Sequence, residues 1–504
     1  MAIVRSTRPL EPPVALALLV FAGWCWVFWP ESIDDAYITL RFARHLAAGD
    51  GLVFNVGERV EGYSNLLWVL LLAGATRIGV ALPLAMKVLG AASGAAVIAL
   101  LARLDRAGSR WPMRWAPLAF AASPLAGLWA VDGLETMAYT ALLTGTALAW
   151  AARRSGSAGL CAAGAALMRP EGPLFAAIVS AALLRDAWHE RRLRPLGAAL
   201  VPVAAVAAHF AWRAAYYGAW WPNTAGKLDP GMAALGRGLS YLGGFAAASG
   251  FVPLGLAALA LAARPRSRLA AIGAAFVAAQ CGFVLLSGGD FMWGWRFVMP
   301  VWPLLAMLVP VGVGVLAASL RPLGASAAGG LAVAVLATSQ LAALPRLAPV
   351  LATSRAPRDV HYQIAAHLRE RTGRADTVLL SEAGIIPFQL EARVVDYLGL
   401  VTPKRAVNGA AGGQLDWDYL FASVPLYVVT TVVTERDGSE RPRLQNDVRL
   451  REAPQFRCCY ELEASFPIPI DGGFLDQLYY RWAEDAAAIR FELWRRRGPA
   501  PAGP

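Results

Sequence analysis

The chain has 504 residues, of which 57% are apolar and only 16% are charged. A soluble globular protein carries about 25% charged residues, and a disordered chain is poor in apolar ones, so both classes are excluded. The charges occur in clusters between long apolar runs, which is typical of a protein that crosses a membrane several times.

The net charge of +11 does not indicate a nucleic-acid partner. The arginines gather in short segments between apolar runs, such as 103–114 and 185–194. The positive-inside rule explains such clusters as cytoplasmic loops. The five cysteines have neither a metal-ligand spacing nor a disulfide framework.

About eleven membrane-spanning helices are predicted, at 13–29, 83–102, 116–131, 136–152, 157–168, 172–184, 196–212, 241–262, 269–287, 297–318 and 323–343. The first run lacks a small-residue cleavage site, so we expect an uncleaved span. A further apolar run, 63–80, is predicted to be a juxtamembrane helix, because only then do all arginine-rich loops lie in the cytoplasm. The predicted topology has the N-terminus inside and the C-terminus outside.

Two domains are expected. Residues 1–349 form the transmembrane module, whose first outer loop is 30–80, and residues 350–504 form a small extracytoplasmic α/β domain. The second part has no apolar run long enough to span a membrane. It begins with an amphipathic helix from Asp359 to Arg371, and strands are predicted at 377–381, 392–397, 425–433, 456–466 and 489–494.

In this topology every conspicuous polar motif lies on the outer side. Asp34 and Asp35 stand at the end of the first span and open a helix that Gly49 closes. One of them could simply cap this helix. The functional interpretation makes one a general base for an acceptor hydroxyl, while the other orients it or holds a metal.

Arg41, Arg44 and His45 follow at helical spacing, which places a basic stripe on one face. Such a stripe could hold a sugar phosphate, or it could lie against lipid phosphates. Arg169 and Glu171 interrupt an apolar stretch, where a charge costs about 3 kcal/mol, so they either pair with each other or line a cavity.

Other outer motifs combine charges with aromatic residues that could also belong to an interfacial belt. Lys227 follows Asn223 in a Tyr/Trp-rich loop, and Asp290, Trp293 and Arg296 form another group. A P-loop, a dinucleotide fingerprint, a metal-ligand spacing and a serine elbow are all missing from the sequence, which argues against a nucleotide-driven pump.

Several of these motifs resemble one family. They are Asp-Asp-Ala-Tyr at 34–37, the segment 49–68, Trp129 with Gly-Leu-Glu-Thr at 133–136, Arg-Pro-Glu-Gly at 169–172, the Pro-Asn-Thr…Lys segment 222–227, the Gly-Gly-Asp…Trp-Arg-Phe segment 288–297, and the segments 381–388 and 394–400. Together they are similar to the GT-C glycosyltransferases. The most similar group is the terminal β-(1→2) arabinofuranosyltransferases of the mycobacterial cell wall and their bacterial relatives.

The resemblance implies a multi-pass enzyme of the bacterial inner membrane with its active site on the extracytoplasmic side. It implies inverting transfer of a sugar, with arabinofuranose as the best match, from a polyprenyl-phosphate donor to a cell-envelope glycan or protein. Asp34 and Asp35 match the acidic positions that supply the base. No metal ligands are assigned, although the two acids could hold Mg²⁺ or Mn²⁺.

The predicted site comprises three groups. Asp34 and Asp35 are catalytic. The donor phosphate is assigned to Arg41, Arg44, Lys227, Arg169 and Arg296. The sugar or acceptor is assigned to Tyr37, Glu61, Tyr63, Asn65, Glu135, Glu171, Asn223, Asp290 and Trp293.

Two other functions compete with this one. A GT-C protein O-glycosyltransferase or a hexosyltransferase would carry the same motifs. A transporter or lipid flippase would use the carboxylates as an ion relay, but such relays lie near the membrane midplane of repeated, broken helices. This sequence has no visible internal repeat, and its charges gather at one outer level.

Overall fold

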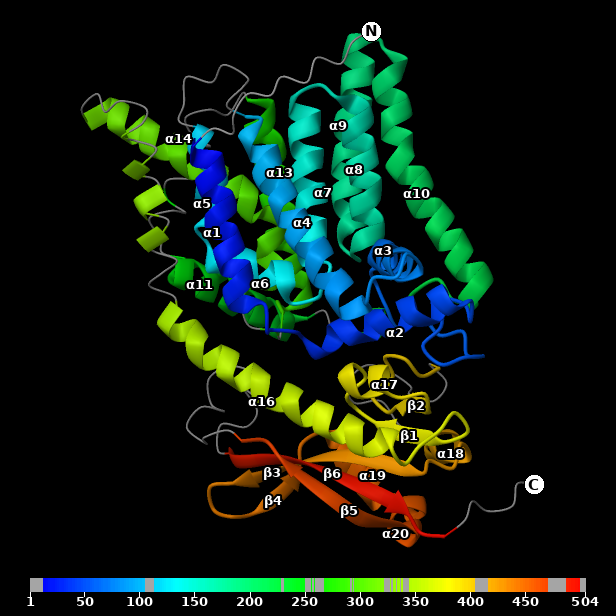
Figure 1. Ribbon diagram of the computed structural model, residues 1–504. Coiled ribbons are helices and arrows are strands. Elements are labelled where there is room, and N and C mark those ends of the chain that lie inside the picture. Colours follow the sequence, from blue (N-terminus) through cyan, green and yellow to red (C-terminus); the bar gives the residue numbers. More distant parts are fainter. Residues whose placement is uncertain are drawn as a thin grey trace.

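The structure is a computed structural model. It describes residues 12–104, 113–227, 231–249, 267–290, 294–320, 344–403, 416–469 and 486–498, together with short pieces between 255 and 338. A helical bundle forms one half of the molecule and a mixed sheet with short helices forms the other (Figure 1). Helix α2 runs across the end of the bundle that faces the sheet.

The first half is helical. Its α-helices are α1 (Pro12–Phe28), α2 (Asp34–Ala48), α3 (Leu66–Arg77), α4 (Leu82–Ala102), α5 (Ala116–Ala121), α6 (Pro124–Val131), α7 (Thr136–Ala151), α8 (Ser155–Met168), α9 (Gly172–Glu190), α10 (Leu193–Tyr217), α11 (Met232–Ser249), α13 (Arg268–Ser287) and α14 (Trp302–Leu320). Short 3₁₀ turns are η2 (Met113–Trp115), η3 (Asn223–Lys227) and η4 (Arg296–Val301). Within the described chain, four segments are long and apolar enough to cross a membrane: Leu82–Ala102, Leu193–Tyr217, Arg268–Ser287 and Arg296–Val313.

The span predicted at 116–131 is two helices rather than one. Helix α5 ends at Ala121 and α6 begins with Pro124. Proline lacks an N–H and its ring clashes with the preceding turn, so the helix breaks there. The span predicted at 241–262 begins earlier, because α11 starts at Met232, and its second half lies outside the described residues, as does most of 323–343.

Helix α3 occupies most of the apolar run 63–80. Its 12 residues extend about 18 Å, whereas the hydrocarbon core of a bilayer is about 30 Å thick. In Figure 1 this helix is seen end-on, while α4 and α7 beside it are seen along their length. The geometry agrees with a juxtamembrane helix.

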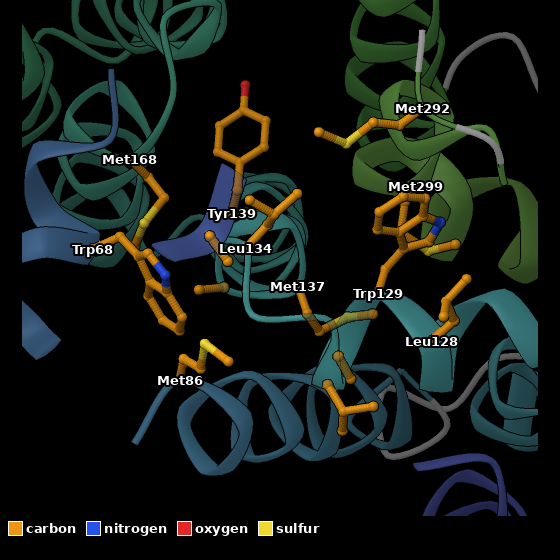
Figure 2. Close-up of a cluster of buried hydrophobic side chains, with 14 of the residues drawn as sticks. Trp68, Met86, Leu128, Trp129, Leu134, Met137, Tyr139, Met168, Met292 and Met299 are labelled. Carbon is orange, nitrogen blue, oxygen red and sulfur yellow. The ribbon is translucent and has the colours of Figure 1, made fainter. Parts of the chain in front are cut away.

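The bundle core near α2 is dense with large side chains (Figure 2). Trp68 and Trp129 are both almost fully buried, and each indole N–H donates to the main chain, to Gly133 O at 3.2 Å and to Gly294 O at 2.8 Å. Gly133 has a φ of +106°, and a Cβ there would lie within 2.9 Å of Ala36 in α2. The glycine therefore lets the turn between α6 and α7 approach α2.

The second half contains one six-stranded sheet. The strands are β1 (Thr377–Leu380), β2 (Arg393–Asp396), β3 (Tyr427–Glu435), β4 (Glu440–Pro442), β5 (Tyr460–Pro467) and β6 (Ala486–Arg496). Their order is β2-β1-β3-β6-β5, with β4 paired to β3. Strand β1 runs parallel to β2 and β3, and the other pairs are antiparallel. The mixed sheet agrees with the predicted α/β class.

The helices around the sheet are α16 (Leu344–Arg369), α17 (Ile385–Gln389), α18 (Trp417–Ala422), α19 (Gln445–Glu452) and α20 (Pro454–Cys459). The amphipathic helix predicted from Asp359 is therefore the last part of α16, which starts 15 residues earlier. The strand predicted from Phe456 was wrong at its start, because 454–459 are helical and β5 begins at Tyr460. Pro454 at the first helical position favours this short turn.

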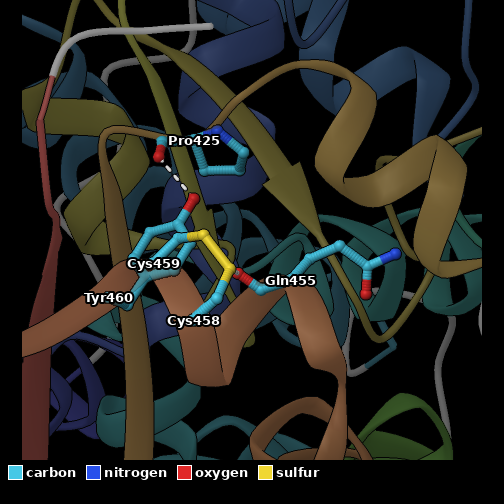
Figure 3. Close-up of a disulfide and its surroundings, with 5 residues drawn as sticks. All are labelled: Pro425, Gln455, Cys458, Cys459 and Tyr460. Carbon is cyan, nitrogen blue, oxygen red and sulfur yellow. Dashed lines mark hydrogen bonds between the residues drawn. A yellow bond between two sulfur atoms is a disulfide. The ribbon is translucent and has the colours of Figure 1, made fainter.

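The adjacent residues Cys458 and Cys459 form a disulfide, although the sequence predicted no disulfide framework (Figure 3). The bridge closes the end of α20 just before β5. Next to it, the Tyr460 hydroxyl donates to Pro425 O at 2.6 Å. Cys25, Cys161 and Cys281 are free.

Arg41 joins the two halves. Its guanidinium is 2% exposed and donates to Phe54 O, Pro387 O and Leu390 O, to Ala392 O at 3.0 Å and to Asn55 Oδ1 at 3.3 Å. Arg44, one turn later, donates to Phe388 O at 2.8 Å and Leu390 O at 3.3 Å. The two arginines of α2 therefore bind the main chain of residues 387–392, in the second half of α17 and directly after it.

We predict that Arg41→Ala destabilises the protein by about 3 kcal/mol, because several buried carbonyls lose their donor. Thermal unfolding in detergent should shift to a clearly lower midpoint. Arg44→Ala is the matched control, with a smaller loss, since its guanidinium is only half-buried and donates to two carbonyls, those of Phe388 and Leu390. An Arg41→Ala variant as stable as wild type would contradict this role.

Candidate active site

The acidic pair opens α2. The N-cap residue is Ile33, whose side chain makes no capping hydrogen bond. Asp34 instead accepts hydrogen bonds at its Oδ1 from His361 Nδ1 at 3.0 Å and from the main-chain N–H of Ile385 at 2.9 Å. For Asp34 the capping interpretation was therefore wrong, because its carboxylate points to the sheet half of the molecule.

The contact around Asp34 is close. A Cβ on Gly384 would lie 2.1 Å from the main-chain oxygen of Asp34 and 2.3 Å from its Oδ2, so only glycine fits there. One turn along α2, the hydroxyl of Tyr37 lies 2.6 Å from that of Tyr362. Adjacent residues of α16, His361 and Tyr362, thus meet Asp34 and Tyr37.

Asp34 and His361 form an ion pair. Burial would raise the pKa of Asp34, but the charge of His361 and the hydrogen bonds from His361 and Ile385 outweigh it, so the pKa lies below its usual value. Burial would lower the pKa of His361, but Asp34 outweighs it and the pKa is raised. Both shifts favour the charged forms of the pair. Among the residues that the structure describes, His361 Nε2 is buried and has no hydrogen-bond partner.

Cations gather next to this pair. Arg358, one turn before His361 on α16, lies 3.8 Å from Glu31 and donates to Pro30 O at 2.7 Å. Arg355, one turn earlier, pairs with the same glutamate. The ammonium of Lys87 in α4 donates to Glu31 O at 2.5 Å and to Val131 O at 2.8 Å. Three cations therefore surround Glu31, which lies three residues before Asp34 in the chain.

A second group of predicted residues meets in the bundle. Arg169 pairs with Glu135 at 2.6 Å and with Glu171 at 2.5 Å, and all three are buried. Asn65 donates to the other oxygen of Glu135 at 2.7 Å and also bonds Thr39 of α2. The alternative that the two charges of 169–171 pair with each other is confirmed. Because two carboxylates surround Arg169, it offers no net positive charge to a phosphate.

Asp290 and Arg296 also pair, with Nε and Oδ2 2.7 Å apart. Asp290 Oδ1 accepts the N–H of Met292 at 3.2 Å. Trp293, predicted beside them, lies outside the described residues. Asp132, at the end of α6, is fully buried, and its Oδ2 has no hydrogen-bond partner in the described chain.

A third group lies between the first outer loop and the end of α10. Glu61 pairs with Arg213 at 2.6 Å, and the main-chain N–H of Asn223 donates to Glu61 O at 3.0 Å. Tyr63 accepts a hydrogen bond from Tyr217 at 3.3 Å. Lys227 ends the turn η3, and its side chain lies outside the described residues.

The assignment of Arg41 and Arg44 to the donor phosphate stays a prediction, and the contacts that the structure shows for them are with other groups. Both guanidinium groups already bind carbonyls of residues 387–392, as described above. Sequence periodicity placed them correctly on one face but could not reveal what covers that face. The residues that sequence reasoning missed are His361, Lys87, Arg355 and Arg358. The spacing of Arg355, Arg358 and His361, three residues apart, could have indicated that they lie on one face of a helix.

Few of the described side chains near the acidic pair could serve as metal ligands. In the part of the chain that the structure describes, no group of three or more His, Cys, Asp or Glu is placed to hold a metal ion. The Oδ1 atom of Asp34 is already bound by His361 and Ile385. The arrangement therefore does not fit a metal centre built from the acidic pair and a third such ligand.

Comparisons with known proteins agree with this architecture. Residues 352–485 match a family described as a domain of unknown function (DUF8728). The chain is 30% identical over 350 residues to the terminal beta-(1->2)-arabinofuranosyltransferase of Mycobacterium tuberculosis, covering 59% of this chain and 54% of that protein. It is 29% identical over 351 residues to the protein of the same name from Corynebacterium glutamicum, covering 59% and 50%. The chain spans about half the length of these curated relatives.

Solved structures extend the likeness over nearly the whole fold. ArnT from Cupriavidus metallidurans bound to undecaprenyl phosphate has a TM-score of 0.57, with 14% identity and 98% of each chain covered. The arabinofuranosyltransferase AftD from mycobacteria has a TM-score of 0.50, with 17% identity, covering 97% of this chain and 40% of that one.

The fold is therefore that of the solved GT-C membrane glycosyltransferases, and four segments of the described chain are long and apolar enough to cross a membrane. Its curated relatives are terminal β-(1→2) arabinofuranosyltransferases, so the family resemblance predicted from the sequence is confirmed. The predicted number of eleven spans and their orientation stay predictions.

The ion pair predicts a pH dependence. The contribution of Asp34 to stability is lost as pH falls through its lowered pKa, and that of His361 is lost as pH rises through its raised pKa. The contact between Ile385 and Asp34 should therefore weaken in alkaline solution. We expect the Ile385 amide to exchange hydrogen for deuterium faster at about pH 9 than at about pH 6, after correction for the intrinsic rate.

His361→Asn is the control for this experiment. Its amide can donate to Asp34 but does not titrate, so the alkaline increase should disappear. An increase of the same size in wild type and variant would contradict the ion pair as its source.

Proposed function

We propose that this protein is a glycosyltransferase that moves a sugar from a polyprenyl-phosphate donor to an acceptor of the cell envelope. Transfer takes place on the outer face of the bacterial inner membrane. Arabinofuranose is the proposed sugar, because the curated relatives carry that activity in their name. A structure of the same fold binds undecaprenyl phosphate, which supports a lipid-linked donor.

The observation that carries the proposal is the setting of the acidic pair. Asp34 and Asp35 lie at the outer end of the first helix, beside the cations around Glu31 and under the sheet half of the molecule. A glycosyl transfer from a phosphate donor needs these two components side by side: an ionised carboxylate to accept a proton, and cations to stabilise the departing phosphate.

In the proposed reaction, one carboxylate of the pair removes the proton from an acceptor hydroxyl. The hydroxyl oxygen forms a bond to the anomeric carbon while the bond from that carbon to the phosphate oxygen breaks. The electron pair leaves with polyprenyl phosphate, and attack opposite to the leaving group inverts the anomeric centre. His361 keeps Asp34 ionised, and no step is routed through a metal ion.

The donor phosphate is assigned to the cations nearest the acids. These are Arg355, Arg358 and Lys87, and Arg358 also pairs with Asp359 at 3.2 Å. The three cations outnumber Glu31 and Asp359, so the group has a net positive charge before Asp132 is counted. Arg296 and Lys227, assigned from the sequence, remain candidates. Arg169 does not, because Glu135 and Glu171 neutralise it.

The test is donor turnover in liposomes. Polyprenyl-phosphate arabinofuranose, mannose and glucose are supplied separately with cell-envelope glycans, and release of polyprenyl phosphate is measured. Wild type should release it with one sugar. Asp34→Asn or Asp35→Asn should reduce release by about 100-fold or more, because the base is lost.

Asp50→Asn is the matched control, since this exposed aspartate follows the other end of α2. It should keep wild-type turnover. Full activity in both Asp34→Asn and Asp35→Asn would refute the base assignment. No release from any donor would favour the transporter or flippase alternative.

The proposed orientation has the N-terminus in the cytoplasm and about eleven spans. It is checked with Ser109→Cys, in the arginine-rich segment after α4. This cysteine should not react with an impermeant maleimide applied to intact cells but should react after permeabilisation, with wild type measured in parallel. Labelling from outside would place the segment on the outer face and would overturn the juxtamembrane assignment of α3.

A further inference from the structure

A cavity of about 510 Å³ lies where the two halves of the molecule meet. Three separate parts of the chain line it: residues 57–61 of the first outer loop, the end of α10 with the loop to Asn223, and Pro403 with Tyr419 of α18. Its volume falls in the usual range of about 300–1,000 Å³ for small-molecule sites. None of the functions proposed above for the acidic pair uses it.

The two glutamates of this cavity are held in place, and their charges are balanced, by arginines that do not line it. Glu58 pairs with Arg393 of β2 at 2.6 Å and also accepts from Asn55 at 3.0 Å. Glu61 pairs with Arg213 of α10 at 2.6 Å. Neither arginine lines the cavity. The two carboxylates therefore lie rigidly at the wall, and each oxygen has lone pairs for a further donor, such as a hydroxyl group.

Aromatic side chains line the cavity beside these acceptors. Trp221 is 61% exposed and packs edge-on against Phe210, with ring centroids 5.4 Å apart. Tyr217 is fixed by a hydrogen bond from its hydroxyl to Leu52 O at 2.7 Å. Tyr419 contributes from the sheet half. Rigid amphipathic rings of this kind provide apolar contact area without losing much conformational entropy on binding.

We propose that this cavity binds the acceptor as a neutral carbohydrate chain, an inference that rests on the function proposed above. A sugar ring presents hydroxyl donors at its edge and C–H groups on its faces. The fixed carboxylates can accept hydrogen bonds from the hydroxyl groups, and the flat aromatic rings can pack against the C–H faces. An anionic ligand is disfavoured, because Glu58 and Glu61 outnumber Arg59, the one cation among the described lining residues. The Arg59 guanidinium lies over the Tyr216 ring, 4.7 Å from its centroid.

The cavity exists only when the two halves are docked. Asn223 donates to Gly399 O at 3.1 Å and to Thr402 O at 2.7 Å. The carboxylate of Asp396 accepts the N–H groups of residues 398, 400 and 401, which fixes this loop. Gly62 lies against the same loop, and a Cβ there would come within 2.7 Å of Leu400 O.

The cavity is separate from the acidic pair. Its loop wall is tied to the middle of α2, since Asn55 bonds Arg41, seven residues after Asp34. Seven helical residues extend about 10 Å. The cavity would therefore hold sugar units of the acceptor other than the one that reacts. Longer oligosaccharides should be better acceptors than a monosaccharide, and this advantage should come from the cavity.

Trp221 and Trp220 provide a matched pair of variants. They are adjacent, and their side chains are 61% and 62% exposed, but only Trp221 lines the cavity. We predict that Trp221→Ala weakens the binding of an arabino-oligosaccharide to the full-length protein in nanodiscs by about tenfold or more, measured by calorimetry without donor. Trp220→Ala should change it by less than about twofold. Tyr419→Ala, from the other half, should act in the same direction as Trp221→Ala.

Turnover separates this inference from the proposed function. If the cavity binds the acceptor, Trp221→Ala raises KM for the oligosaccharide about tenfold and leaves KM for the lipid-linked donor unchanged. Equal binding by wild type and Trp221→Ala, or equal loss in Trp220→Ala, would overturn the assignment. An unstructured peptide that binds there and displaces the oligosaccharide would also overturn it in favour of a protein acceptor. If wild type binds the oligosaccharide but releases no polyprenyl phosphate from any donor, the proposed reaction is refuted and the binding inference is not.

Discussion

The structure depends on how helix α2 satisfies its charges. This helix lies between an apolar bundle and a sheet, yet it carries Asp34, Arg41 and Arg44 on the side that faces the sheet. Burying such groups is costly unless each finds a partner. The main chain of residues 384–392 supplies most of these partners. The polar face of α2 therefore fixes where the sheet half docks.

This docking explains why residues distant in sequence share a site. Once α17 is held on α2, helix α16 brings His361 and Tyr362 to the first turn of α2. The same arrangement places Pro403 and Tyr419 opposite the first outer loop. The sheet half thus positions residues at both the acidic pair and the cavity. A single interface couples the proposed chemistry to the proposed recognition of the acceptor.

Local patterns predicted the elements well and the partners poorly. The helix that starts at the acidic pair and ends at Gly49 was predictable, because a left-handed residue after the last turn favours glycine. Strands β1 and β2 were predictable from their short apolar runs. Arg41 was placed on the correct face, but the choice between a phosphate and a carbonyl partner depends on a segment about 350 residues away. No local pattern encodes that contact.

In the bundle, too, the sequence predicted that buried charges need partners but did not identify all of them. The cost of a charge at membrane depth predicted that Arg169 and Glu171 need partners, and the structure adds Glu135 and, through it, Asn65. Because Asn65 also bonds Thr39 of α2, this network reaches the same helix from the bundle side. Helix α2 is therefore held by polar contacts on two sides, by the bundle through Thr39 and by the sheet half through Arg41. The acidic pair at its start is positioned by both, which is the precision that a base needs when the hydroxyl and the phosphate-bearing carbon must meet at bonding distance.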